Sequence, residues 1–314
     1  MKSGPVVQLN RTSDSGSESR GFESRRGHKI MKKSTHPLLQ LLVMLAMALG
    51  MLLIASTPSA VLAIAGVDIT SRSALMWIET ITQILTFLVP VALMTLIYYR
   101  GQQREYYRLD FSGRKWYYGL AGVAVMLLFT PLYDWLTTWN DSWELGRVGE
   151  MMRQLQNQTE GIMKSMLGTT SVGGLMANLV VVALLPAVCE EVFFRAGIQN
   201  LLQRWLKSPH AAIWITALIF SLAHGEVFAF MPRFAMGAVL GYLYVYGGSL
   251  LPNMLAHFVN NAIVVVLYWL VARGVLDIDP DAPLNLGWTV VAVCSLAALT
   301  LFYAVFMMAR KKEE

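Results

Sequence analysis

Residues 175–205 read LMANLVVVALLPAVCEEVFFRAGIQNLLQRW, a long apolar segment with two adjacent glutamates and an arginine near its centre. A segment of this length can cross the hydrocarbon core of a membrane, which is about 30 Å thick and takes about 20 apolar residues. An unpaired charge at the centre of such a helix costs about 2.5 kcal/mol or more. Glu190, Glu191 and Arg195 therefore need a structural or a functional reason.

The composition of the chain places this segment in a membrane protein. Hydrophobic residues make up 55% of the 314 residues and charged residues only 14%, whereas charged residues are about 25% of an ordinary soluble domain. Apolar windows long enough to span occur eight times, so we expect an all-α, polytopic bundle of about eight transmembrane helices. They run approximately over residues 38–56, 75–98, 116–136, 175–205, 211–230, 231–246, 250–271 and 288–308. The fifth and sixth are short and nearly contiguous, which leaves seven as the other count.

Charge alternates between the loops that join these segments. The basic loops precede the first segment and follow the second, fourth and eighth, through Lys32, Lys33, Arg100, Arg104, Arg108, Arg114, Lys115, Arg204, Lys207, Arg310, Lys311 and Lys312. Because loops rich in lysine and arginine stay in the cytoplasm, we expect an integral membrane protein with both termini cytoplasmic. The net charge of +5 then reflects topology. Outside those loops no basic face is interleaved with aromatic residues, so we expect no nucleic-acid partner.

The chain divides into four expected regions: residues 1–30, 31–172, 173–272 and 273–314. The first is rich in Ser, Gly and Arg and is expected to be disordered. Part of it, GFES at 21–24, reads like a translated arm of a tRNA gene, so we interpret Met31 as the natural start. The first apolar segment could instead be a signal peptide, because small residues at 55–63 resemble a cleavage site.

The second region holds the first three segments and the longest polar connection, residues 137–172. Apolar and polar residues alternate irregularly from Met152 to Leu167, which fits an amphipathic helix on the outer membrane surface. A plain extramembrane loop fits equally well. The third region is the candidate catalytic core, and the fourth is a last helix with a basic tail.

The acidic motif assigns different surroundings to its two glutamates. On a helix Glu191 and Arg195 lie one turn apart with the acid N-terminal, the better orientation for an ion pair. Glu190 is rotated by about 100° from Glu191, so it faces another surface and is free to act as a base. Pro186 removes an amide and tends to kink the helix, which can open space beside Glu190. The alternative is a buried ionic lock between helices, which leaves Glu190 unexplained.

Two histidines occur in later apolar segments, each with a partner four residues away. They are Phe220 with His224 in FSLAH, and His257 with Asn261 in HFVNN. His257 and Asn261 share one helix face. Their imidazole and amide can donate to a developing oxyanion, an arrangement worth about 3 kcal/mol per donor in acyl transfer. Asn260 lies off that face and is expected to contact another helix.

Cysteines and glycines in the apolar segments suggest ordinary packing. Cys189 and Cys294 have no metal or redox spacing, so we expect small buried residues. Cys189 as a nucleophile is the rival interpretation, although apolar surroundings would blunt its thiol. Gly237 and Gly241 form a Gly-x-x-x-Gly face that favours close helix packing, with a dimer contact as the alternative. The sequence does not indicate an oligomeric state.

In order, the three polar motifs resemble those of the CPBP family (CAAX protease and bacteriocin-processing), intramembrane endopeptidases that include the Rce1-type CAAX prenyl endopeptidases and bacterial relatives linked to bacteriocin self-immunity. The resemblance covers about residues 175–271. It implies that Glu190 with His224 activates a water, and that His257 with Asn261 holds the tetrahedral oxyanion. It also implies that Glu191 with Arg195 supports Glu190, and it favours a retained first helix in a bacterial cell membrane.

The resulting expectation is an intramembrane endopeptidase that cuts a peptide or membrane-protein substrate in or near the lipid bilayer. Two other classes stay open. One is a catalytically silent bacteriocin-immunity or scaffold protein. The other is a proton-coupled transporter with Glu190 and the histidines as a relay, although the absence of an internal repeat in the sequence argues against it.

We expect no metal cofactor. Zinc held by Glu190, His224 and His257 is the alternative. The usual His-Glu-x-x-His helix is absent from the sequence, and ligation would take His257 away from Asn261. The one candidate acid to orient a zinc-bound His224 is Glu226.

Overall fold

The computed structural model describes residues 35–66, 68–109 and 115–307, and these residues belong to one compact unit. The interpretation of residues 1–30 falls outside the described part of the chain. The described residues form helices joined by short loops, with no strand among them. The expectation of an all-α bundle is therefore confirmed.

Six helical runs are long and apolar enough to cross a membrane, and a bent pair brings the number within the described ranges to seven. The runs are Pro37–Thr57, Arg72–Tyr98, Val172–Leu206, Val227–Gly247, Leu250–Ala272 and Trp288–Phe306. The bent pair is α5 (Lys115–Leu128) with α6 (Thr130–Asp141), which meet at 41°.

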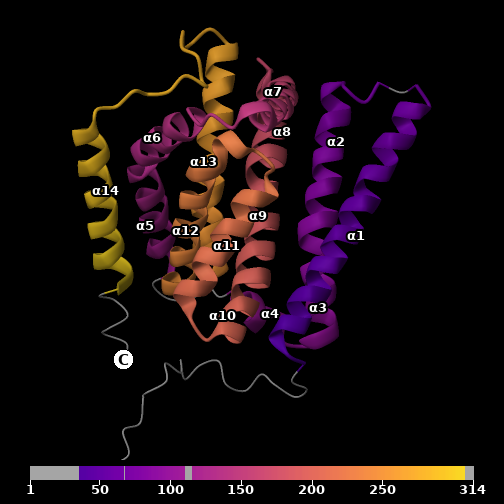
Figure 1. The fold of residues 1–314 in the computed structure, drawn as a ribbon, viewed down its shortest axis with the longest axis vertical. Helices are drawn as coiled ribbons and strands as arrows, with labels where there is room; N and C mark the ends of the chain where they lie inside the picture. The colour runs from indigo at the N-terminus through magenta and orange to yellow at the C-terminus, as the bar shows by residue number, and fades with distance from the viewer. Residues whose placement is uncertain (1–34, 67, 110–114, 308–314) are drawn as a thin grey trace, which may run out of the picture. The chain divides into compact units, whose positions relative to one another are not determined.

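These runs comprise most of the elements shown in Figure 1. In chain order they are α1 (Pro37–Ile64), α2 (Arg72–Gln83), η1 (Ile84–Leu88), α3 (Val89–Tyr98), α8 (Val172–Asn178), η2 (Leu179–Leu184), α9 (Leu185–Glu190), η3 (Glu191–Gln199), α10 (Asn200–Leu206), η4 (Val227–Ala229), α12 (Phe230–Gly247), α13 (Leu250–Ala272), α14 (Trp288–Phe302) and η5 (Tyr303–Met307). A short helix, α4 (Gln103–Tyr107), lies between α3 and α5.

Seven, the other count that the sequence allows, is the upper number of described runs that meet the length criterion, because the fifth expected segment, residues 211–230, falls short of it. Its helix, α11 (Pro209–Ala223), has 15 residues, which is about 22 Å at 1.5 Å per residue and short of the roughly 30 Å hydrocarbon core. The helix ends early because Gly225 adopts a φ of +69° and Glu226 is extended. His224 is its C-cap residue.

Polar contacts join the loops into two opposite sets. In one set, Arg204 at the end of α10 donates to the Tyr99 hydroxyl at 2.7 Å, and that hydroxyl donates to Gln40 at 2.6 Å. In the other set, Asn140 at the end of α6 donates to the Val227 carbonyl at 3.0 Å and accepts from the Met231 amide at 2.8 Å. Since α11 links the end of α10 to residue 227, it runs from one set to the other despite its length.

Helices α5, α12 and α13 pack side by side around the centre of the bundle (Figure 1), and α11 packs along α12. The two glycines of α12 make that contact close. A Cβ at Gly237 would lie 3.2 Å from the Ala217 Cα, and one at Gly241 would lie 2.9 Å from the Ile213 Cγ2. These glycines therefore serve helix packing within the chain, as the sequence predicts.

The long polar connection contains a helix, α7 (Gly146–Leu167), so the helical alternative is correct. Arg153 on α7 lies over the Phe228 ring, with its guanidinium carbon 3.6 Å from the ring centroid, and forms an ion pair with Asp141. Farther along, Lys164 pairs with Asp281 at 2.7 Å. These contacts fix α7 against the loops near residues 228 and 281. Its placement on a membrane surface stays a prediction.

Candidate active site

The acidic motif lies in the helical run from Val172 to Leu206, which is uninterrupted over 35 residues. Pro186 does not break this helix. It sits in α9, directly between the π-helical segments η2 and η3, and the second of these begins at Glu191. Single π-helical turns are rare inside α-helices and are frequent at functional sites.

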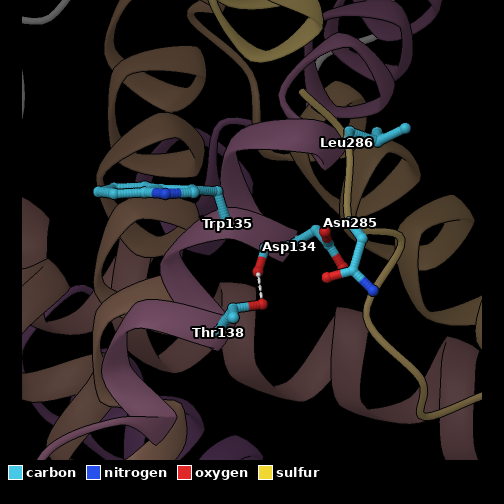
Figure 2. A pocket seen from close by; sticks show the side chains of 5 residues that line it. All are labelled: Asp134, Trp135, Thr138, Asn285 and Leu286. Carbon is cyan, nitrogen blue, oxygen red and sulfur yellow. Dashed lines mark hydrogen bonds between the residues drawn. The ribbon is translucent and has the colours of Figure 1, made fainter. Parts of the chain in front are cut away.

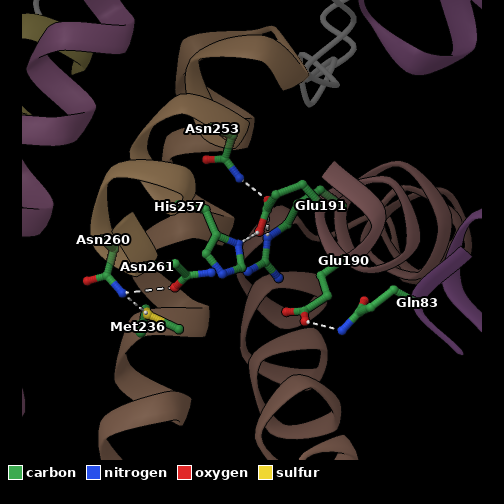
Figure 3. Close-up of polar contacts among 9 residues, drawn as sticks. Gln83, Glu190, Glu191, Met236, Asn253, His257, Asn260 and Asn261 are labelled. Carbon is green, nitrogen blue, oxygen red and sulfur yellow. Dashed lines mark hydrogen bonds and ion pairs between the residues drawn. The ribbon is translucent and has the colours of Figure 1, made fainter. Parts of the chain in front are cut away.

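Glu191 is surrounded by hydrogen-bond donors. Its Oε2 accepts from Arg195 Nε at 3.1 Å and from the Asn253 amide, and its Oε1 lies 3.0 Å from His257 Nδ1. Glu191 and Arg195 are both fully buried. The ion pair expected from the spacing is therefore present, and two further groups from α13 join it (Figure 3).

Arg195 uses only part of its donor capacity. Its Nη1 and Nη2 atoms are buried and have no partner among the described side chains and backbone groups. Its guanidinium carbon lies 5.3 Å from the centre of the Phe220 ring. Because a guanidinium carries five N–H donors, these two nitrogens remain available to water.

Glu190 points away from this cluster, as Figure 3 shows. Its side chain is buried, and its Oε1 accepts one long hydrogen bond, 3.5 Å from Gln83 Nε2 on α2. The two glutamates thus face different surfaces, as expected from one residue of helix rotation. Gln83 is a site residue that the sequence analysis missed, since it lies 107 positions away from Glu190.

His224 is oriented by its own helix. Its Nδ1 lies 2.7 Å from the Phe220 carbonyl oxygen, which can only accept, so Nδ1 carries the proton and Nε2 presents a lone pair in the neutral ring. The Phe220 ring centroid lies 4.8 Å from that of His224 and 6.2 Å from that of His257. Glu226 does not orient His224. It pairs instead with Arg233 at 2.5 Å.

The oxyanion candidates lie on α13. The Nδ1 atom of His257 is hydrogen-bonded to Glu191, so Nε2 is the ring nitrogen that can bind another group. Asn261 accepts at 3.4 Å from Asn260, and Asn260 also contacts the Met236 sulfur on α12 at 3.6 Å. Asn260 is therefore a helix-contact residue, as the sequence predicts.

Asn253 extends the polar stripe of α13 by one more step. Asn253, His257 and Asn261 are spaced by four residues, which places them along one face of the helix. The sequence analysis overlooked Asn253, although this spacing was a usable signal. The three side chains give α13 a continuous row of donors opposite the acidic motif.

The structure does not join every expected pair directly. Glu191 meets His257, but no hydrogen bond links Glu190 to His224 within the described residues, so a shared water would have to bridge them. In the same part of the chain no three His, Cys, Asp or Glu side chains lie where they could hold a metal ion. The expectation of a metal-free site, with zinc at Glu190, His224 and His257 as the alternative, stays a prediction.

A hollow of about 170 Å³ lies elsewhere, at the base of the loop before α14. Figure 2 shows its lining by Asp134, Trp135, Thr138, Asn285 and Leu286. None of the candidate residues contributes to it. The candidate site is instead enclosed between α2, the acidic helix, α11 and α13.

The comparisons with known proteins bear on this enclosed site. A family model described as type II CAAX prenyl endopeptidase Rce1-like matches residues 172–263. We call this matched segment the Rce1-like domain. The match confirms the CPBP resemblance and spans every candidate residue from Glu190 to Asn261. No curated protein and no solved structure matches the chain.

The Rce1-like domain begins at the first residue of α8 and ends within α13. Its similarity to a family of membrane proteases, together with the apolar helices, identifies the chain as an integral membrane protein. Helices α1 to α7 and α14 lie outside the domain, so Gln83 is a contribution from outside it.

Proposed function

We propose that this chain is an intramembrane endopeptidase that hydrolyses a peptide bond with a water activated by Glu190 and His224. The observation that carries this proposal is the difference between the hydrogen-bond partners of the two adjacent glutamates. Glu191 is occupied by donors from Arg195, Asn253 and His257, whereas Glu190 accepts one long hydrogen bond. A general base needs a free lone pair within reach of the water, and of the two adjacent glutamates Glu190 has the less occupied carboxylate.

In the proposed reaction Glu190 takes a proton from the water while His224 Nε2 orients it. The hydroxide attacks the carbonyl carbon of the scissile bond and the carbonyl π-electrons move to oxygen. Protonated Glu190 then gives its proton to the amine as the C–N bond breaks. The products are a carboxylic acid and an amine, no covalent enzyme intermediate forms, and the family match supports protease chemistry in general.

The tetrahedral oxyanion is held by Asn261 Nδ2 and by His257 Nε2. Since Nδ1 of His257 serves the Glu191 carboxylate, Nε2 can donate only when the ring is protonated. A protonated His257 also gives the Glu191 carboxylate a second cationic partner beside Arg195. Buried charges persist when they are paired in this way.

The substrate class is a peptide or a membrane protein that enters from the lipid bilayer. A prenylated CAAX peptide fits where the host prenylates its proteins. We further propose a bacterial cell membrane with both termini cytoplasmic, as the alternation of basic loops predicts. This orientation places the residue 99–108 loop and the end of α10 on the cytoplasmic side.

The test compares the wild type with Glu190→Gln, both reconstituted in liposomes. The probes are an internally quenched prenylated CAAX peptide and a set of single-pass membrane-protein reporters. Glu190→Gln should abolish cleavage and leave the melting temperature in detergent nearly unchanged. Wild-type turnover in Glu190→Gln would refute the mechanism, and cleavage of no probe by the wild type would favour a silent immunity or scaffold protein.

A further inference from the structure

A second acid lies inside the bundle, on the membrane-crossing run of α2. Glu79 is half-buried, and its Oε1 accepts a hydrogen bond from Gln83 Nε2, one helical turn later, at 2.9 Å. The same Nε2 lies 3.5 Å from Glu190 Oε1. Charged residues within membrane helices are rare and usually functional, so Glu79 needs an explanation that the mechanism above does not give.

The chemistry of the amide fixes how Gln83 must point. Ionised carboxylates only accept hydrogen bonds, and an amide nitrogen has two hydrogens. One hydrogen therefore serves Glu79 and the other serves Glu190. The opposite orientation would set the amide oxygen against two acids. As placed, Gln83 Oε1 is buried without a donor among the described residues, a cost that a merely structural contact between helices does not require.

We propose that Gln83 is a positioning residue for Glu190, and that Glu79 holds Gln83 in the required rotamer. This inference rests on the proposed role of Glu190 as the base. The amide hydrogen of Gln83 that does not bind Glu79 donates to one carboxylate oxygen of Glu190 and holds it towards α2. The other carboxylate oxygen is then left for the water. Helix α2, which lies outside the Rce1-like domain, thereby completes the active site.

A structural role would have different consequences. If Gln83 only ties α2 to α9, its loss lowers the melting temperature, and the protein that remains folded turns over normally. If it positions Glu190, its loss lowers kcat in fully folded protein and leaves KM unchanged, because the proposed role acts on the base and not on substrate binding.

The experiment uses the full chain in liposomes with Gln83→Leu, Glu79→Leu and the double variant. Gln83→Leu should lower kcat about tenfold or more, the usual effect of losing a hydrogen bond to a charged group. Glu79→Leu should lower kcat less, and should have no further effect when Gln83→Leu is already present. The matched control is Thr86→Val on the adjoining segment η1, since Thr86 and Gln83 are both 8% exposed and the Thr86 hydroxyl has no partner among the described residues.

The outcomes separate this inference from the proposed function. If Glu190→Gln is inactive but Gln83→Leu keeps a kcat within twofold of the wild type, only the positioning role of Gln83 is overturned. Active Glu190→Gln overturns the proposed function. Additive effects of Glu79→Leu and Gln83→Leu on kcat overturn the action of Glu79 through Gln83.

A second measurement does not depend on activity. The melting temperatures of Gln83→Leu, Glu190→Leu and their double variant form a double-mutant cycle in detergent, in which leucine at position 190 removes the acceptor. Coupled shifts support the contact between the amide and the carboxylate, and strictly additive shifts overturn it.

Discussion

Replacing Arg195 with methionine is expected to lower the free energy of unfolding by about 3 kcal/mol, the lower end of the range for breaking a buried ion pair. Methionine is similar in length and keeps the apolar packing, including the contact with Phe220. The loss comes from Glu191, which stays buried without its cation. The estimate takes the lower end because Asn253 and His257 still donate to Glu191.

The partner variant sharpens this prediction. Glu191→Met should destabilise by a comparable amount, because Arg195 is then a buried cation without its acid. Arg195→Met/Glu191→Met replaces both charges with apolar groups and should lose less than either single variant, as buried pairs commonly do. Glu190→Gln is the matched control, since Glu190 has no cationic partner among the described contacts.

Denaturant unfolding of purified protein in detergent measures these differences, with retained helical signal as the check that each variant is folded before titration. Strictly additive losses in the double variant would refute the idea that Arg195 and Glu191 stabilise the fold as a pair. A loss under about 1 kcal/mol for Arg195→Met would place the pair in the class of weak surface contacts, against its complete burial.

Four further predictions follow from the structure. Asn261→Ala should lower kcat about 10²- to 10³-fold with little change in KM, the usual effect of losing one oxyanion donor, and an unchanged kcat would remove Asn261 from the site. Gly241→Ala should destabilise by about 1–3 kcal/mol through overpacking, whereas Gly50→Ala, with open space around its Cβ, should not. Elemental analysis should find no stoichiometric zinc, and dialysis against a chelator should leave turnover unchanged. Stoichiometric zinc that is lost together with turnover on dialysis, with turnover restored by added zinc, would contradict the metal-free mechanism. Hydrogen exchange in the loop after α13 should rise below about pH 4, as Asp281 protonates and releases Lys164, and Asp281→Asn should remove that acid-side change.

The sign of that last effect follows from the two ends of the ion pair. Partial burial would raise the pKa of Asp281, but the hydrogen bonds from Lys164 and Tyr268 outweigh it and lower the pKa. The hydrogen bond to Asp281 raises the pKa of Lys164. Because its pKa is lowered on folding, Asp281 stabilises the folded state above pH 3.8, and this stabilisation is lost as pH falls. Because its pKa is raised on folding, Lys164 stabilises the folded state below pH 10.5, and this stabilisation is lost as pH rises. The Asp281–Lys164 ion pair is therefore fully formed between these two pH values.

Local spacing predicted the parts of the site that lie on a single helix. The Glu191–Arg195 pair, the opposed direction of Glu190 and the packing role of Asn260 all follow from helix geometry, which is fixed by sequence separation. Asn253 obeys the same spacing and could have been found. The family resemblance added roles that geometry alone does not assign.

Contacts between distant segments could not be predicted in this way. Gln83 reaches Glu190 only because α2 packs against α9, and nothing in the sequence around Gln83 specifies that neighbour. The partner of Glu226 was missed for a related reason, since η4 and the first turn of α12 separate it from Arg233. The turn at Gly225 ends α11 early, so a hydropathy window, which averages over the break, predicted a longer helix than the structure has.

The Rce1-like domain does not enclose the candidate site by itself. On the Glu190 side, the wall is built by the run from α2 to α3, where the Phe87 ring lies 5.2 Å from Phe193 and 5.8 Å from Phe194. On the far side of α13, a Cβ at Gly119 of α5 would lie 3.1 Å from the Leu255 side chain, so α5 packs closely against the helix that carries His257. Under the proposed mechanism, a carboxylate base and its oxyanion donors must be held within fractions of an ångström. We therefore expect turnover to depend on helices that the family match does not include.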